Sequence, residues 1–269
     1  ANILDGNVDL ILVGDSLGTT LYGMKNTRSV NLEMMKSHGK AVVANTKKSM
    51  TIIDMPYKTY RNKTEALKNA LGILNVLEAY RNNCPTARFY QASSSEMFGR
   101  TVDEDGYQRE TTKMEPTSPY GCTKVFGYNM VKHYRNAYNL FAVNGILFNH
   151  ESPRRGANFV TNKVVKSAVE IKKGLRKELP LGNLDASRDW GHSKDYVRAM
   201  HMIINHTEPD DFVCATGVTN SVGDMCEYVF SKLDMNYKDY VTQDPRFMRA
   251  EELKYLRGDS TKLRETLGW

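Results

Sequence analysis

The stretch Ala87-Arg-Phe-Tyr-Gln-Ala-Ser-Ser-Ser-Glu96, followed further along by Tyr120-Gly-Cys-Thr-Lys124, decides the fold of this chain. The apolar run in the first stretch predicts a buried strand at 87–92 that ends in polar side chains. The second stretch opens a segment with helical spacing, so Tyr120 and Lys124 are expected one turn apart on one helix face. A buried strand followed by such a helix is typical of α/β proteins.

The polar groups of these two stretches suit a site that forms a carbonyl and removes a proton beside it. Tyrosine has an ordinary pKa of about 10, so Tyr120 is a base near neutral pH only when a nearby cation favours the phenolate. Lys124 can be that cation. The spacing alone also fits a chance pair on a surface helix, so it needs support from the rest of the chain. The candidate catalytic residues are therefore Glu96, Tyr120, Lys124 and a hydroxyl of the run Ser93-Ser94-Ser95.

Strand and helix patterns alternate along the chain, which favours α/β layers with a mainly parallel sheet. We expect strands at 9–13, 41–44, 50–54, 87–92, 142–148 and 211–215. We expect helices at 30–38, 64–81, 119–138, 160–174, 193–206 and 221–233.

Composition narrows the class of protein. The 269 residues suffice for one large domain or two modest ones, and no apolar run is long enough for a transmembrane helix. The net charge of +6 is spread out, with no Lys or Arg run longer than two, which argues against a nucleic-acid or membrane partner. The four cysteines lack C-x-x-C spacing, so we expect reduced thiols in a cytoplasmic protein.

A series of motifs follows in order from about Leu71 to Trp269: Phe89-Tyr-Gln-Ala-Ser-Ser-Ser-Glu96, Ser118-Pro-Tyr-Gly-Cys-Thr-Lys124, Asn144-Gly-Ile-Leu-Phe-Asn-His-Glu-Ser-Pro-Arg-Arg-Gly156, Leu181-Gly-Asn-Leu-Asp-Ala-Ser-Arg-Asp-Trp-Gly-His192, Phe212-Val-Cys-Ala-Thr-Gly217, Asp244-Pro-Arg-Phe-Met-Arg249 and Gly258-Asp-Ser-Thr-Lys262. In these motifs the segment resembles the GDP-mannose 4,6-dehydratases of the extended short-chain dehydrogenase/reductase superfamily. The resemblance implies GDP-mannose as substrate, NADP as cofactor, a step in GDP-fucose biosynthesis and a homo-oligomer.

The resemblance also implies a reaction. Hydride passes from C4 of the hexose to NADP⁺, the resulting ketone acidifies the C5 proton, water leaves from C6, and hydride returns to C6. Tyr120 would take the C4 hydroxyl proton, while Lys124 lowers the pKa of Tyr120 and holds the nicotinamide ribose. Ser94, where the family usually has threonine, would hydrogen-bond the same hydroxyl, and Glu96 would remove the C5 proton.

Further family positions bind the cofactor and the nucleotide. His150 and Arg155 match positions that contact NADP, and Arg155 can pair bidentately with phosphate. Arginines suit the diphosphate and a glutamate suits the ribose diol, although a structural salt bridge is the alternative for each charged residue. The residues that match GDP-binding positions are Asn149, Lys163, Arg188, Arg249 and Glu252.

The first 70 residues differ from that family. Dehydratases open with a Gly-x-x-Gly-x-x-Gly turn for the cofactor pyrophosphate, whereas Gly14-Asp-Ser-Leu-Gly18 has another spacing. Here the stretches Val8-Asp-Leu-Ile-Leu-Val-Gly-Asp-Ser-Leu-Gly18, Ala41-Val-Val-Ala44 and Thr51-Ile-Ile-Asp-Met-Pro56 resemble ketopantoate hydroxymethyltransferase, a (β/α)8-barrel enzyme. This second resemblance implies Asp15 and Asp54 as Mg²⁺ ligands. Aspartates at strand ends also cap helices or form turns.

The two resemblances meet inside one continuous helical pattern at Thr64–Tyr80, with no linker between them. We therefore expect an incomplete NAD(P)-binding Rossmann-like fold with a small C-terminal substrate-binding portion. It would be preceded by β/α units that resemble a TIM-barrel fragment, with regions 1–70 and 71–269 in a chimeric or fragmentary chain. Three hypotheses follow: a GDP-mannose 4,6-dehydratase, a hydroxymethyltransferase fragment, or a catalytically dead fragment that binds a GDP-sugar.

Overall fold

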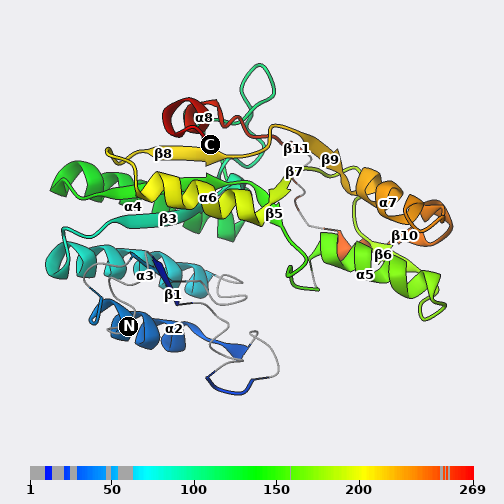
Figure 1. Ribbon diagram of the computed structural model, residues 1–269, viewed down its shortest axis with the longest axis horizontal. Helices are drawn as coiled ribbons and strands as arrows, with labels where there is room; N and C mark the ends of the chain where they lie inside the picture. Colours follow the sequence, from blue (N-terminus) through cyan, green and yellow to red (C-terminus); the bar gives the residue numbers. More distant parts are fainter. Residues whose placement is uncertain are drawn as a thin grey trace. The chain divides into compact units, whose positions relative to one another are not determined.

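The computed structural model describes residues 10–13, 21–24, 29–46, 50–53, 63–157, 159–248, 251, 253 and 255–269. Contacts between residues divide the chain into two compact units, whose elements are labelled in Figure 1. The first unit comprises 1–93, 119–145 and 203–211, and the second comprises 94–118, 146–202 and 212–269.

The first unit begins with a β-α-β arrangement. Strands β1 (Leu10–Val13) and β2 (Met50–Ile53) pair in parallel, as a right-handed crossover through a helix requires. Helix α2 (Leu32–Val43) lies between them in sequence and contacts both strands. The side chain of Asn31 caps this helix by accepting a hydrogen bond from the backbone N–H of Met34 at 3.0 Å. The strands expected at 9–13 and 50–54 are thereby confirmed.

The strand expected at 41–44 is wrong, because these residues end helix α2. Val42 packs against the buried side chains of Val30 and Met35, so the apolar run belongs to the buried face of the helix. Packing therefore overrode the β-propensity of the Ala-Val-Val-Ala sequence.

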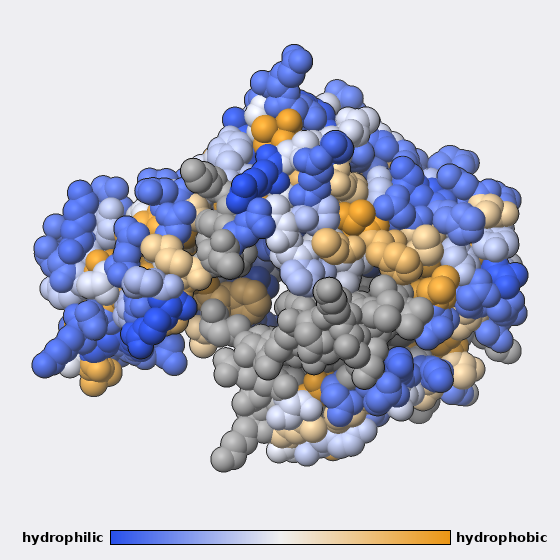
Figure 2. All heavy atoms as spheres, turned by 180° about the vertical axis from the view of Figure 1, so that it is seen from behind, coloured by the Kyte–Doolittle hydropathy of each residue, from blue (hydrophilic) through white to orange (hydrophobic). Residues whose placement is uncertain are grey.

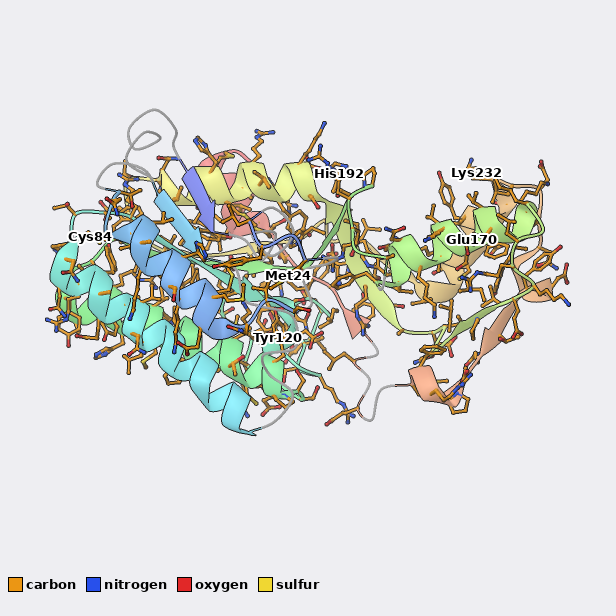
Figure 3. The ribbon with its side chains drawn as sticks, turned by 90° about the horizontal axis from the view of Figure 1, so that it is seen from below. Met24, Cys84, Tyr120, Glu170, His192 and Lys232 are labelled. Atoms are coloured by element: carbon orange, nitrogen blue, oxygen red, sulfur yellow. The ribbon has the colours of Figure 1, made fainter. Side chains whose placement is uncertain are left out.

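Two long helices of the first unit, α3 (Lys63–Asn83) and α4 (Pro119–Tyr138), pack side by side (Figures 1 and 3). Both were expected, and α3 runs without a break through the region where the two sequence resemblances meet. Hydrogen bonds from Arg81 and Tyr134 hold the pKa of the Glu78 carboxyl at about 2, and the bond from Tyr134 links α4 to α3. Their shared core is Leu77, Tyr80, Val131, Tyr134, Leu140 and Ala142.

A three-stranded sheet has the order β3 (Phe89–Ser94), β4 (Ala142–Leu147), β8 (Asp211–Cys214). Every residue of β4 and β8 is buried, which explains why their sequences are apolar runs rather than alternations. A Cβ atom on Gly145 would lie 1.8 Å from the Tyr90 hydroxyl, so β4 needs a glycine there.

The second unit contains short strands around β7 (Ser187–His192). β7 pairs in parallel with β5 (Asn149–Glu151) and β11 (Tyr255–Leu256), and antiparallel with β9 (Thr219–Ser221). A separate parallel pair joins β6 (Leu179–Leu181) to β10 (Val241–Gln243). A strand of two or three residues is too short to show an alternation of apolar and polar side chains, which is why the sequence did not indicate these short strands.

Three more helices were expected, at 160–174, 193–206 and 221–233, and all three are found, whereas the helix at 261–267 was not expected. α5 (Val160–Lys172) and α7 (Val222–Ser231) pack together, and Ser221 and Asp224 form a reciprocal capping box at the start of α7. The remaining helices are α6 (Ser193–Ile204) and α8 (Thr261–Leu267), with the 3₁₀ turns η2 (Ser95–Met97), η3 (Tyr237–Asp239) and η4 (Pro245–Phe247). The core between α5 and α7 includes Val164, Ala168, Ile171, Leu179, Leu181, Cys226 and Phe230.

The face drawn in Figure 2 is mostly polar, with small hydrophobic patches between charged side chains. None of the described helices combines the length and apolar character that crossing a membrane requires. All four cysteines are unpaired, and burial raises the pKa of the Cys226 thiol to about 11.

Candidate functional site

Tyr120 and Lys124 lie in the first turns of α4, in the first unit (Figure 3 labels Tyr120). Proline at the first helical position has no N–H to satisfy, so Pro119 fixes the start of the helix one residue before Tyr120. The Lys124 ammonium lies 5.5 Å from the centre of the Tyr120 ring and donates a hydrogen bond of 2.7 Å to the carbonyl of Ala92 in β3. The cation is thus held beside the phenol and at the end of the strand, as the spacing predicted.

Ser94 and Glu96 belong to the turn that follows β3. The Ser94 hydroxyl accepts a hydrogen bond from the backbone N–H of Glu96 at 3.3 Å, which starts η2. Ser118 donates its hydroxyl proton to the Glu96 carboxylate at 3.3 Å. The turn ends at Gly99, whose φ of +59° and close approach to the Glu115 carbonyl exclude a side chain. The turn therefore holds its carboxylate in a defined place.

His150, in β5, has its ring fixed from two sides. Its Nδ1 is 2.9 Å from the Phe148 carbonyl, and because a carbonyl can only accept, Nδ1 carries the proton. The ring stacks on buried Tyr196 with centroids 4.8 Å apart, and Trp269 meets Tyr196 edge-on. This arrangement presents Nε2 as the ring atom that can contact a ligand.

Arg155 is held by a salt bridge. Its Nε lies 3.1 Å from the Glu151 carboxylate, and its guanidinium stacks over the Phe159 ring at 3.5 Å. Thr161 donates a hydrogen bond to the same Glu151 carboxylate at 2.7 Å. The structural alternative considered for this arginine is therefore present, and the guanidinium is oriented by its neighbours.

Two of the predicted nucleotide-binding residues contact the segment from Asp244 to Leu253. Lys163, on α5, donates to the Pro180 carbonyl at 2.7 Å and lies 4.0 Å from the centre of the Phe247 ring. Burial lowers the pKa of Lys163, and the nearby charge of Arg176 adds to this effect. On β7, Arg188 donates to the Leu253 carbonyl at 2.5 Å. Arg249 and Glu252, in the same segment, lie outside the described residues.

Close packing fixes residues 244–247, the described start of this stretch. Asp244 donates its backbone N–H to the Leu181 carbonyl at 2.7 Å, and a Cβ atom on Gly182 would lie 2.5 Å from the Phe247 carbonyl oxygen. Asn149, the remaining predicted residue, starts β5 opposite Trp190 of β7. The structure therefore brings Lys163 into contact with Phe247 and Arg188 into contact with Leu253, links that sequence spacing could not show.

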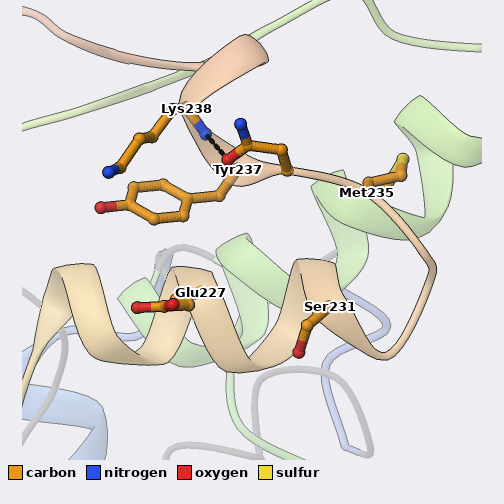
Figure 4. Close-up of a pocket in the computed structure, with 6 residues that line it drawn as sticks. Glu227, Ser231, Met235, Tyr237 and Lys238 are labelled. Carbon is orange, nitrogen blue, oxygen red and sulfur yellow. Dashed lines mark hydrogen bonds between the residues drawn. The ribbon is translucent and has the colours of Figure 1, made fainter.

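No metal centre is found among the described residues, where no three His, Cys, Asp or Glu side chains converge. Asp15 and Asp54, the candidate Mg²⁺ ligands, lie outside the described residues. A shallow pocket of about 240 Å³ opens between α7 and η3, and none of the predicted site residues lines it (Figure 4). Its lining residues are Glu227, Ser231, Met235, Asn236, Tyr237 and Lys238.

Sequence reasoning missed the role of Ser118 as partner of Glu96 and of Ala92 as partner of Lys124. Ser118 stands immediately before the proline that begins α4, so a hydroxyl close to the helix start could have been noticed. Nothing local in the sequence marks the Ala92 carbonyl, because the contact joins residues from a strand and a distant helix.

The family model for GDP-mannose 4,6 dehydratase matches residues 50–269. The chain belongs to this family. GDP-mannose 4,6 dehydratase 2 of Arabidopsis thaliana is 48% identical over 204 residues, covering 74% of this chain and 54% of that protein. The human GDP-mannose 4,6 dehydratase is 44% identical over 221 residues, covering 75% of this chain and 59% of that protein. The chain thus spans between half and two thirds of the length of these relatives.

A second family model, ketopantoate hydroxymethyltransferase, matches residues 1–81 and overlaps the first over 50–81. The dehydratase match therefore begins at β2, upstream of the expected residue 71. The proposed division at residue 70 stays a prediction.

Solved structures show the fold. RMD from Pseudomonas aeruginosa, complexed with NADPH, has a TM-score of 0.77 at 20% identity, covering 97% of this chain and 92% of that one. dTDP-glucose 4,6-dehydratase from Bacillus anthracis, in complex with NAD, has a TM-score of 0.71 at 17% identity, covering 97% and 91%. The Rossmann-like α/β fold is confirmed, whereas the TIM-barrel fragment expected at the N-terminus is not confirmed.

Proposed function

We propose that this chain carries the catalytic and substrate-binding part of an NADP-dependent GDP-mannose 4,6-dehydratase, a hydro-lyase. The reaction would convert GDP-mannose to GDP-4-keto-6-deoxymannose and water, a step toward GDP-fucose. The observation that supports this most is the Lys124 ammonium, held between the Ala92 carbonyl and the Tyr120 ring. It lies in the region that shares 48% identity with a plant GDP-mannose 4,6 dehydratase.

The described residues fit the nicotinamide end of NADP. Lys124 offers a fixed cation and Tyr120 a phenol for the ribose hydroxyls, and Nε2 of His150 is a further polar contact. Arg155 is the candidate for a cofactor phosphate, since its guanidinium is already oriented. When bound, NADP⁺ supplies a reversible acceptor for hydride. The glycine spacing of residues 14–18 departs from the family turn, so we expect weaker pyrophosphate binding than in full-length relatives.

Each catalytic residue has a defined proton to handle. Tyr120 takes the proton of the C4 hydroxyl as hydride leaves C4, and Ser94 hydrogen-bonds the same oxygen. Glu96 then takes the C5 proton and gives it to the departing C6 hydroxyl, which leaves as water, so that one proton, taken by Tyr120, remains for return to C5. Hydride returned to C6 and a proton returned to C5 complete the product, so the net change is the loss of one water.

Charge complementarity supports a nucleotide at the segment from Asp244 to Leu253. The half-buried Lys163 contacts Phe247 and the guanidinium of Arg188 contacts Leu253, and both cations suit a diphosphate. By family position Asn149 and Arg249 join them, and Glu252 binds the ribose diol. The same family relation leads us to propose a cytoplasmic homo-oligomer.

The test is incubation of the purified chain with GDP-mannose and NADP⁺, followed by mass spectrometry of the sugar nucleotide. A product lighter by one water, absent with Tyr120→Phe, is the expected result. Product formed equally by the Tyr120→Phe variant would refute the proposed mechanism. GDP binding with neither NADP⁺ binding nor product would favour the catalytically dead GDP-sugar-binding fragment.

A further inference from the structure

A buried polar relay runs through the sheet of the first unit, and its centre is Asn144 of β4. The side chain is fully buried. Its Oδ1 accepts a hydrogen bond from the Ser93 hydroxyl at 3.1 Å, and its Nδ2 donates to the Asp211 carboxylate at 2.8 Å. Because the oxygen faces a hydroxyl and the nitrogen faces a carboxylate, only one orientation of the amide satisfies both partners.

One end of the relay is anchored by a buried ion pair. Arg135 of α4 reaches both oxygens of Asp211 at 2.9 Å and also donates to the Ala142 carbonyl at 3.0 Å. The side chains of Arg135 and Asp211 are 11% and 6% exposed. A bidentate guanidinium fixes the plane of the carboxylate, which in turn fixes the donor atom of Asn144.

The other end of the relay is Ser93, which lies near the end of strand β3 and next to the proposed catalytic residue Ser94. Ser93 is buried and lies between Ala92, whose carbonyl holds the Lys124 ammonium, and Ser94. The position of the Ser93 side chain therefore affects two neighbouring groups. These are the Ala92 carbonyl, which orients Lys124, and the backbone that carries the Ser94 hydroxyl.

We propose that Asn144 is a positioning residue, which holds the end of β3 through Ser93 so that the Ala92 carbonyl keeps Lys124 beside Tyr120. This role deepens the proposed function and rests on it, because it assumes that Tyr120 and Lys124 are the reacting pair. The amide is suited to the position, since it accepts from Ser93 and donates to Asp211 at the same time. An aspartate would place two carboxylates together, and a leucine would remove the hydrogen bonds that Asn144 makes with Ser93 and Asp211.

The test measures Lys124 directly, without substrate or cofactor. The purified chain is treated with a limiting amine-acylating reagent, and the modification rate of each lysine is read from its peptide by mass spectrometry. In Asn144→Leu, and more mildly in Ser93→Ala, we expect Lys124 to react about 2- to 10-fold faster relative to the other lysines. This range corresponds to the loss of one ordinary hydrogen bond.

A matched control lies at the opposite end of the same strand. Tyr80 donates its hydroxyl proton to the carbonyls of Ala87, at 2.7 Å, and Phe141, at 3.1 Å. Tyr80→Phe thus removes buried hydrogen bonds beside the start of β3, far along the strand from Ala92. We expect it to lower stability by a similar amount while the relative reactivity of Lys124 stays unchanged.

Unchanged Lys124 reactivity in both Asn144→Leu and Ser93→Ala would overturn the proposal, as would an equal rise in Tyr80→Phe. If Asn144→Leu does not fold, Ser93→Ala alone decides, because it removes one hydroxyl and leaves Asn144 paired with Asp211. Failure of the proposed function is a separate result. It would appear as no dehydration product from the unaltered chain, with the labelling pattern intact.

Discussion

Replacing Arg135 with methionine should destabilise the first unit strongly, because it breaks a buried ion pair. Methionine keeps most of the length of the side chain but removes the guanidinium. The Asp211 carboxylate, 6% exposed, would then stay buried beside Asn144 without the guanidinium that neutralises it. An uncompensated buried charge of this kind costs about 3–5 kcal/mol.

The magnitude follows from the contacts that are lost. Arg135 makes two hydrogen bonds to a charged partner and one to the Ala142 carbonyl. Hydrogen bonds that involve a charged group contribute about 1.5–3 kcal/mol each, and partial relaxation reduces the sum of the three to the range above. At about 2–4 °C for each kcal/mol in a protein of this size, the melting temperature should fall by about 6–20 °C.

Thermal unfolding followed by circular dichroism is the assay, with Lys36→Met as control. That variant breaks the exposed Lys36–Glu33 pair, whose partners are 37% and 79% exposed, and should change stability by less than about 1 kcal/mol. A second variant combines Arg135→Met with Asp211→Asn. The asparagine removes the negative charge at position 211 but keeps an oxygen that accepts from Asn144, so the melting temperature should partly recover. Equal melting temperatures for Arg135→Met and Lys36→Met would refute the reasoning.

Three further predictions follow from single side chains. Gly145→Ala should lower the free energy of unfolding by about 1–3 kcal/mol, because its Cβ would overlap the Tyr90 hydroxyl. Gly72→Ala in α3, where the space is open, should raise it by up to about 1 kcal/mol. The reverse order of the two variants in urea unfolding would contradict the packing. Burial raises the pKa of Tyr80 to about 12, so the folded chain keeps a proton that the unfolded chain releases near pH 10. The free energy of unfolding should then fall between about pH 10 and 12, and a slope unchanged in Tyr80→Phe would contradict this. Lys163→Met should weaken GDP binding about 10- to 100-fold in calorimetry. Because burial lowers the pKa of Lys163, the affinity of the unaltered chain for GDP should fall at a lower pH than an ordinary lysine would give. Unchanged affinity in Lys163→Met would show that Lys163 does not belong to the site.

The sequence predicted the long elements well because their patterns are long. Helices α3 and α4 each extend over several turns of amphipathic spacing, and strand β3 is an apolar run bounded by polar residues. The prediction at 41–44 was wrong because Ala-Val-Val-Ala suits a strand locally but continues the buried face of α2. The sequence did not indicate the strands of the second unit, because these strands are defined by pairing with segments that are distant along the chain.

Part of the candidate site could also be predicted. The spacing of Tyr120 and Lys124 places them one turn apart in any helix. The hydrogen bond from Lys124 to Ala92 depends instead on how α4 packs beside β3. Likewise, the contacts of Lys163 and Arg188 with one C-terminal segment depend on tertiary structure, which local patterns do not encode.

The most direct test of the proposed function follows a deuterium label. GDP-mannose with deuterium at C4 would be incubated with the chain and NADP⁺, and the product analysed by mass spectrometry and NMR. An internal hydride transfer predicts a product that has lost one water and carries the deuterium on the C6 methyl group. A dehydrated product without deuterium at C6, or unaltered GDP-mannose in the presence of bound NADP⁺, would contradict the assignment of this chain as a working dehydratase.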